Sequence, residues 1–411
     1  MTKEEVLNKD VEEKKALAKD RNTSIEVLTM LANDEEYEVR LAVAENPNTP
    51  PETLAKLADD EENDIREYVA SNPSTPIDIL TKLAIDEEVT VRAEVAKNPN
   101  TPIEVLEQLS QNKSFWTKQH VASNPSTPPE ILEKLSDDKH WYVRAAVAYN
   151  HNTPVEVLAK LVKDRDEEDE DAEVRVAIIK NPKVTKELLE ELSNDEHERV
   201  RITVAENPST PSETLEKLAN DKDDFVRLTA AKNPNTPIEP SNILEQLSQS
   251  KKTWIRAEVA KDPSTPATAL KKLADDEDWW IRQSIASNPS TPKEILTKLA
   301  DISLNKITDI HSNKHKKDNK YELYGVDLTE EAISDEIRVL EAIVKHPNTP
   351  AEVFQKASEN VDREARLLIA SNHKTPSEIL TKLSNDEEEI VRDTVKETLK
   401  TQQNKSISPT M

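Results

Sequence analysis

The chain has 411 residues, and 81 acidic against 55 basic side chains give it a formal net charge of −26. Such a charge repels phosphate backbones and argues against a nucleic-acid partner. Cysteine is absent, which excludes disulfides, thiolate metal sites and a cysteine nucleophile. No apolar run reaches the ~20 residues of a membrane span, and the first residues do not begin a signal peptide. We therefore expect a cytoplasmic protein that does not contact a membrane.

A period of 26 residues dominates the sequence. A Thr-Pro dipeptide or its equivalent recurs thirteen times, and most steps between successive copies are 26 residues long, while three steps lengthen to 31, 29 and 58 residues. A fixed period of this size is typical of a solenoid, in which each unit buries its apolar side chains against its neighbours. The copies lie at Thr23, Thr49, Thr75, Thr101, Thr127, Thr153, Val184, Thr210, Thr236, Thr265, Thr291, Thr349 and Thr375.

Each unit is predicted to hold two short helices. In residues 39–64, Thr49 is expected to cap a helix that carries Leu54 on its apolar stripe, and an acidic run then leads into the next helix. That next helix carries Ile65 inward and must stop before Pro73. The Thr-Pro pairs could also be kinase sites, but one capping role accounts for all of them.

The recurring string V-R-x-x-V-A-x-N-P-x-T-P-x-E-x-L-x-x-L-A-x-D, which matches across residues 14–398, resembles the leucine-rich repeat variant family. The resemblance implies an all-α fold: an α-solenoid, or right-handed superhelix, of about 13 two-helix repeats without a β-sheet. One helix of each pair could be 3₁₀. The Val-Arg pair is shared with HEAT-like helical solenoids. Some family members carry a cysteine-rich iron–sulfur module, which this chain cannot form because it has no cysteine.

The period divides the chain into five expected segments. We expect an N-terminal cap over residues 1–22, helical repeats over 23–301, an insertion loop over 302–333, C-terminal helical repeats over 334–400 and a disordered tail over 401–411. The insertion contains the concentrated basic stretch 311–320, and we interpret it as a mobile loop that could dock a partner. Its His311 and His315 have a spacing of four residues, but a metal pair is not expected in an Asn/Lys-rich segment.

Arginine occupies one column of the repeat. We predict a structural role, in which each guanidinium bonds to aspartate or to helix-terminal carbonyls of the adjacent unit. The alternative is a stripe that binds anions. The column contains Arg40, Arg66, Arg92, Arg144, Arg175, Arg201, Arg227, Arg256, Arg282, Arg366 and Arg392, with Lys118 and Leu340 as exceptions. The Asn-Pro column is also interpreted as structural, because asparagine can bond its own turn, and His346 substitutes for asparagine there.

Aromatic residues gather just before the arginine column, at the start of the second helix. Grouped aromatic side chains are typical contact anchors, and we therefore predict partner binding there, in two clusters near 115–142 and 225–280. The alternative is that the rings cover the corner between helices. The candidates are Phe115, Trp116, Trp141, Tyr142, Phe225, Trp254, Trp279 and Trp280.

Residues 163–173 form an acidic loop that could hold a divalent cation, but the loop lacks EF-hand spacing. We expect a solvated loop, no metal site and no cofactor. The favoured function is a non-enzymatic scaffold that binds a protein partner, plausibly a basic one. The alternative is a nucleic-acid-binding repeat protein that uses the arginine column. An enzyme is the least favoured class, because no catalytic set or glycine-rich phosphate loop is legible.

Overall fold

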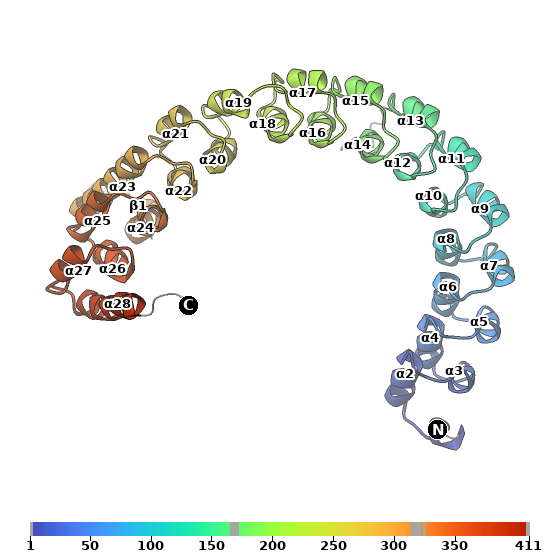
Figure 1. The fold of residues 1–411 in the computed structure, drawn as a ribbon. Coiled ribbons are helices and arrows are strands. Elements are labelled where there is room, and N and C mark those ends of the chain that lie inside the picture. The colour runs from blue at the N-terminus through green and yellow to red at the C-terminus, as the bar shows by residue number, and fades with distance from the viewer. Residues whose placement is uncertain (1–2, 165–171, 314–321, 324–325, 408–411) are drawn as a thin grey trace. The chain divides into compact units, whose positions relative to one another are not determined.

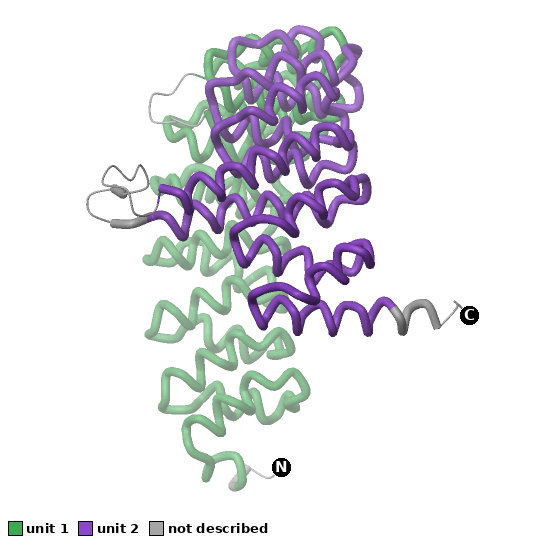
Figure 2. The backbone as a smooth tube through the Cα atoms, turned by 90° about the vertical axis from the view of Figure 1, so that its left-hand side faces the viewer, with its two compact units in different colours: residues 1–214 green, residues 215–411 purple. Residues whose placement is uncertain are grey.

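The computed structural model describes residues 3–164, 172–313, 322–323 and 326–407. The chain divides into two compact units, Met1–Thr214 and Leu215–Met411 (Figure 2). Each unit is a stack of short helices, described separately below.

Unit 1 holds helices α1 to α16, and α17 crosses the boundary between the units. The bounds are α1 Lys3–Leu7, α2 Val11–Lys19, α3 Ile25–Leu31, α4 Tyr37–Glu45, α5 Pro51–Leu57, α6 Asn63–Ser71, α7 Ile77–Leu83, α8 Val89–Lys97, α9 Ile103–Ser110, α10 Phe115–Ser123, α11 Pro129–Leu135, α12 Trp141–Tyr149, α13 Val155–Leu161, α14 Glu173–Lys180, α15 Lys186–Leu192, α16 Glu198–Glu206 and α17 Ser212–Leu218.

Unit 2 continues the same alternation. Its elements are α18 Asp224–Lys232, α19 Pro240–Leu247, α20 Thr253–Lys261, α21 Ala267–Leu273, α22 Trp279–Ser287, α23 Lys293–Asn313, β1 Glu322–Leu323, β2 Val326–Asp327, α24 Thr329–Lys345, α25 Ala351–Ser358, α26 Arg363–Ser371, α27 Ser377–Leu383 and α28 Glu389–Ile407.

The helices form two rows within each unit. In unit 1 the even-numbered helices lie on the inner side of the unit's curve and pack closely on one another, and the odd-numbered helices from α3 onward form the outer row (Figure 1). This arrangement confirms the predicted all-α solenoid. No 3₁₀ helix occurs in the described ranges, so the 3₁₀ helix that the resemblance allowed is not found. The one addition is a two-residue antiparallel ladder between β1 and β2.

Apolar side chains at fixed positions hold each stack together. Leu54 and Leu57 of α5, and Ile65 and Val69 of α6, are almost completely buried. Each such side chain contributes about 1.5–3 kcal/mol when removed from water. Helices of seven to nine residues are too short to persist alone, so this burial between neighbouring repeats is what keeps them folded.

The threonine column does not have the expected capping role. Pro50, rather than Thr49, precedes the first residue of α5. The Thr49 hydroxyl instead donates to the Val43 carbonyl oxygen at 2.6 Å, and so satisfies an open carbonyl at the end of the preceding helix. The equivalent bond recurs from Thr23 to Thr375. Threonine therefore ends one helix, and the following proline sets the extended backbone that starts the next.

The residues expected to form an insertion loop are helical at both ends. α23 continues through Asn313, and α24 begins at Thr329, because apolar side chains such as Leu304, Ile307 and Ile333 are buried against the stack. Residues 314–321, which include His315 and most of the basic stretch, lie outside the described residues. Residues 401–407 of the expected disordered tail belong to α28, which extends to Ile407, and residues 408–411 lie outside the described residues.

The segment expected to cap the N-terminus contains one more repeat helix. α2 packs against α4 as the later even-numbered helices pack on one another, and its Asp10 and Glu13 form a reciprocal capping box. Lys14 occupies the arginine position and pairs with Asp34 at 2.8 Å. The repeat therefore begins within the predicted cap.

Candidate functional site

The arginine column forms a ladder that runs through the repeats. Arg40 Nε bonds Asp60 Oδ2 at 2.8 Å in the next repeat, and its Nη1 donates to the carbonyl oxygens of Asp34 and Glu35 at 3.0 Å. The Asp60 carbonyl in turn accepts from Arg66. The same pairing across 20 residues recurs at Arg66–Asp86, Lys118–Asp138, Arg144–Asp164, Arg175–Asp195, Arg256–Asp276 and Arg366–Asp386.

The other arginines of the column also bond to carbonyls or carboxylates of the chain. The residue 20 positions after Arg92 is Asn112 rather than aspartate. Arg92 donates to the carbonyl oxygens of Asp86 and Glu87. Arg227 pairs with Asp224 on its own helix. Arg282 pairs with Glu336, and Arg201 and Arg392 donate to carbonyls of their own loops. Guanidinium groups engaged in this way lie within the array and are directed at the chain's own carbonyls and carboxylates.

A second ladder runs through the asparagine column. Asn72 Nδ2 donates to the Ala44 and Asn46 carbonyl oxygens of the previous repeat at 2.7 and 2.9 Å, and its Oδ1 accepts from the Ser74 backbone N–H. The predicted structural role of this column is confirmed. His346 replaces asparagine with the same chemistry: Nε2 lies 2.9 Å from the Asn288 carbonyl oxygen, and Nδ1 accepts from the Asn348 N–H at 3.1 Å.

The candidate aromatic side chains differ in exposure. The second aromatic position, two residues before the arginine column, contains Trp116, Tyr142, Trp254 and Trp280, whose exposed fractions are 49%, 47%, 39% and 38%. Phe225 at the same position is half-buried, as are Phe115, Trp141 and Trp279. The rings therefore partly cover the helix corner and partly face solvent, with the second position outermost.

The aromatic residues of unit 1 are stacked on one another across α10 and α12. Phe115 stacks on Tyr142 with ring centroids 6.0 Å apart, and Tyr142 stacks on Trp141 at 3.7 Å. Trp116 meets the His120 ring edge-on at 5.2 Å. Burial, the largest effect, outweighs the nearby Glu94 carboxylate and lowers the pKa of His120 from its ordinary value. Trp116 therefore has an uncharged neighbour at neutral pH.

In unit 2 the candidates do not form one cluster. Phe225 contacts Trp254 edge-on at 4.9 Å. The other two rings are covered by cations of the chain itself, since Lys261 Nζ lies 4.9 Å from the centre of Trp280 and Arg338 lies 5.3 Å from that of Trp279. The structure thus brings Phe115, Trp141 and Tyr142 of unit 1 together, while Trp116 contacts His120. In unit 2 it brings Phe225 and Trp254 together.

Sequence reasoning predicted that aspartates or carbonyl oxygens would bind the arginine column, but it did not name the individual partners. The aspartate of the ladder is visible in the sequence 20 positions after Arg40, Arg66, Arg144, Arg175, Arg201, Arg256 and Arg366. Glu336 is not visible in this way, because 54 residues separate it from Arg282. His120 was also overlooked, although its place one turn after Trp116 on α10 was a usable signal.

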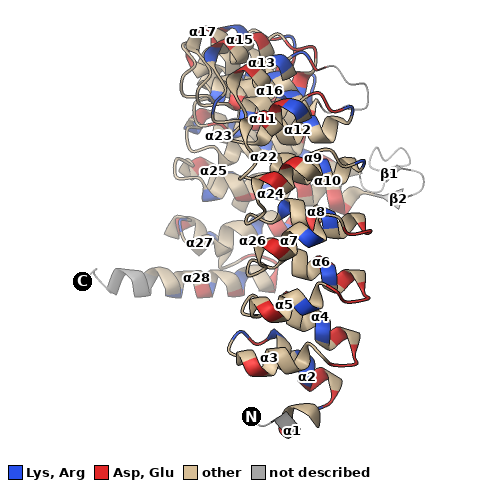
Figure 3. Cartoon of the chain, turned by 90° about the vertical axis from the view of Figure 1, so that its right-hand side faces the viewer, with Lys and Arg blue, Asp and Glu red and all other residues tan. Residues whose placement is uncertain are grey.

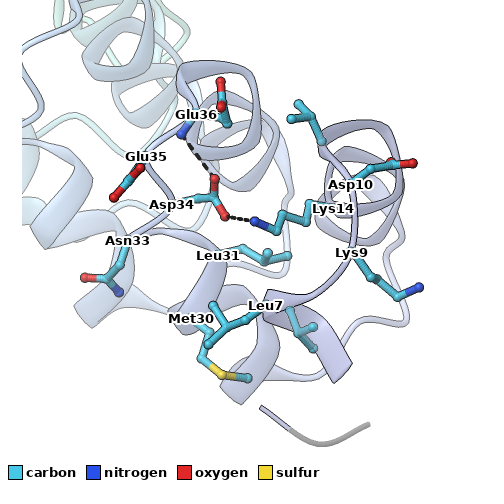
Figure 4. Close-up of a pocket in the computed structure, with 12 residues that line it drawn as sticks. Leu7, Lys9, Asp10, Lys14, Met30, Leu31, Asn33, Asp34, Glu35 and Glu36 are labelled. Carbon is cyan, nitrogen blue, oxygen red and sulfur yellow. Dashed lines mark hydrogen bonds and ion pairs between the residues drawn. The ribbon is translucent and has the colours of Figure 1, made fainter. Parts of the chain in front are cut away.

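Other features offer no built site. Among the described residues no group of three metal-ligating side chains is found, and none of the described helices is long and apolar enough to cross a membrane. A cavity of about 640 Å³ beside α1, α2 and α3 is lined by Leu7, Met30 and the Lys14–Asp34 pair (Figure 4). The acidic residues 165–171 lie outside the described residues, so the cation alternative for that loop stays open.

The fold therefore defines a helical-repeat solenoid. The leucine rich repeat variant family matches residues 37–62, 89–111 and 198–223, and these three stretches are repeats of that family, as the recurring string indicates. No curated protein sequence matches the chain.

Solved structures similar to this chain include two importins. An importin beta crystallised in ammonium sulfate is 11% identical, with 96% of this chain and 59% of that chain covered and a TM-score of 0.36. Yeast importin-beta (Kap95p) is 14% identical, with 95% and 58% covered and a TM-score of 0.33. This chain spans less than two thirds of the length of either.

Proposed function

We propose that this chain is a non-enzymatic scaffold that binds a protein partner through the exposed aromatic side chains at the starts of its even-numbered helices. The observation that carries the proposal is the pair Trp116 and Tyr142, which occupy the same position in consecutive repeats and are both about half exposed. Large aromatic side chains that remain in water at one edge of a rigid array are characteristic anchors for a partner.

A basic partner is favoured by the net charge of −26. The field of an acidic solenoid speeds encounter with a positively charged surface, and salt screens this attraction. A cytoplasmic location belongs to the same proposal. The nucleic-acid alternative draws no support from the arginine column, because those guanidinium groups bond to carboxylates and carbonyls of the chain itself.

The test is capture of partners from a native-cell extract on the immobilised full chain at low and high salt. The double variant Trp116→Ala/Tyr142→Ala is compared with Tyr149→Ala, which removes another exposed aromatic residue of α12. We expect the double variant to lose, by about tenfold, a protein that the wild type and Tyr149→Ala both retain at low salt. Equal capture by all three proteins would refute the proposal.

A further inference from the structure

The aromatic pair of unit 1 lies on an edge whose charge changes sign once, between α8 and α10. We define this unit 1 edge by two positions, five and two residues before the arginine column, in the five repeats that contain α4, α6, α8, α10 and α12. The fifth position holds Glu35, Glu61, Glu87, Lys113 and Lys139, and the second holds Glu38, Asp64, Thr90, Trp116 and Tyr142. The repeats of α4, α6 and α8 are therefore acidic at this edge, and those of α10 and α12 are aromatic, with lysine at the position five residues before the arginine column.

The arginine ladder fixes the backbone of this edge. Arg40, Arg66 and Arg92 donate to the carbonyl oxygens of the three glutamates at the fifth position, at 3.0, 3.2 and 2.8 Å. Their carboxylate side chains are exposed and have no ion-pair partner among the described residues. Figure 3 shows acidic residues in the loops that lead into α4, α6 and α8. The backbone beneath these carboxylates is thus hydrogen-bonded to the ladder, and their side chains are exposed. Glu61 and Glu87 lie in the field of Arg40 and Arg66 but form no ion pair with them.

The aromatic half of the edge is similarly open. In unit 2 the equivalent ring of Trp280 is covered by Lys261 of the previous repeat, whereas no described cation of the chain lies over Trp116 or Tyr142. Lys118, which takes the arginine position on α10, is itself paired with Asp138. Although Trp116 contacts His120 and Tyr142 stacks on Phe115 and Trp141, the two side chains remain 49% and 47% exposed, and this exposed area is available to a ligand from outside the chain.

We infer that the unit 1 edge binds one extended segment of a partner protein that has a run of basic residues next to two apolar side chains. The basic run lies over α4, α6 and α8, and the apolar side chains lie on Trp116 and Tyr142. This inference rests on the proposed function and specifies the partner's chemistry. The free charges of the edge select the order, because a basic run placed over α10 and α12 would meet Lys113 and Lys139.

The spacing of the repeats sets the register of the segment. Packed helices lie about 8–10 Å apart. A segment in the extended polyproline II conformation advances about 3.1 Å per residue and has three residues per turn, so every third side chain lies on the same face. One repeat therefore corresponds to about three residues of the partner. Side chains at every third residue would meet successive repeats, first three cations and then two apolar anchors.

The test uses fluorescence anisotropy with the full chain and labelled synthetic peptides. The graded peptide has three lysines at every third residue followed by two leucines at the same spacing, and its reverse covers the opposite chain direction. A permuted peptide has the same composition with lysines and leucines alternating. We expect the graded peptide or its reverse to bind about tenfold more tightly than the permuted peptide at low salt. Equal binding of all three would overturn the inference.

Charge-reversal variants locate the basic run. Glu35→Lys/Glu61→Lys/Glu87→Lys should weaken the better graded peptide by about tenfold or more. Glu104→Lys/Glu130→Lys/Glu156→Lys makes the same charge change at exposed positions of the outer helix row and should leave more of the binding. Equal losses in the two triple variants would mean that only net charge matters, and displacement of the peptide by a single-stranded oligonucleotide would indicate a nucleic-acid interface. Either result would overturn the inference.

The two proposals fail in distinguishable ways. In one case the Trp116→Ala/Tyr142→Ala variant fails to capture an extract protein that the wild type captures, but the graded, reversed and permuted peptides bind equally well. The scaffold function then stands, and the inferred order of basic and apolar residues fails. If the aromatic variant captures everything that the wild type captures, the scaffold function itself fails.

Discussion

Glu336 of α24 accepts a hydrogen bond from Arg282 Nη2 of α22, although 54 residues separate them. The Oε2 atom of Glu336 accepts from Ser303 Oγ at 2.8 Å. Its Oε1 atom, which also accepts from Arg282, lies 3.3 Å from Lys306 Nζ. Arg282 is only 1% exposed. In other repeats an aspartate 20 residues downstream neutralises the arginine. Here α23 and α24 are longer than the repeat helices that precede them, and the carboxylate that pairs with Arg282 comes from α24 instead.

Glu336→Gln should therefore destabilise the chain strongly. The substitution keeps the side chain's shape but leaves the buried guanidinium without its counter-charge, which costs about 3–5 kcal/mol. Chemical denaturation followed by circular dichroism measures the change. Glu331→Gln serves as the control, because it removes an exposed carboxylate from the same helix. Similar unfolding midpoints for the two variants would contradict the buried pair.

Asn112→Asp should stabilise unit 1. Arg92 Nε is buried without a partner among the described residues, and Asn112 occupies the position at which other repeats provide aspartate. A carboxylate there completes the ladder and should add about 1 kcal/mol. Thermal unfolding tests this, with the neighbouring exposed Gln111→Glu as the control of equal charge. The prediction fails if Asn112→Asp raises the melting temperature no more than the control does.

The ladder also predicts acid sensitivity. Burial opposes ionisation of Asp86, but the Arg66 guanidinium and the Glu88 backbone N–H together lower the pKa of this carboxyl below its ordinary value. The same balance lowers the pKa of Asp386 beside Arg366. A carboxyl whose pKa is lower in the folded than in the unfolded chain stabilises the fold fully above the unfolded value of about 3.9, and that contribution is lost as the pH falls through the folded pKa.

We therefore expect the melting temperature to fall steeply below about pH 4. Asp86→Asn should flatten this dependence, while Asp59→Asn, which removes an exposed carboxylate of the preceding repeat that pairs with Lys82, should do so less. Parallel pH profiles for the wild type and Asp86→Asn would show that the Arg66–Asp86 pair contributes nothing to acid unfolding.

His346 should be replaceable by the residue for which it substitutes. Asparagine can donate to the Asn288 carbonyl and accept from the Asn348 N–H, as other members of its column do in their own turns. His346→Asn should keep the stability within about 1 kcal/mol, whereas His346→Leu leaves both backbone groups unpaired and should cost about 1–3 kcal/mol. Urea denaturation of the two variants decides the matter, and equal losses would show that ring volume rather than hydrogen bonding holds this turn.

Much of the fold could be predicted because the same local sequence signals recur in each repeat. Leu54 and Ile65 mark the two buried stripes, Pro73 ends a helix, and Arg66 marks the ladder. These signals act over a few residues, and their recurrence at 26 residues specifies stacking of each unit on the next. The period alone therefore indicated an all-α solenoid and the positions of its core side chains.

Contacts between repeats were decided by the tertiary structure. Thr49 could have capped the following helix, yet it bonds to the preceding one, because the turn places its hydroxyl beside the Val43 carbonyl. Trp280 has the same position in its repeat as Trp116, but among the described residues a lysine lies over the ring of Trp280 and none lies over that of Trp116. Such pairings depend on which side chains the stacking brings within a few ångströms of one another. Where helices lengthen, as α23 and α24 do, the number of residues between two positions no longer predicts whether their side chains meet.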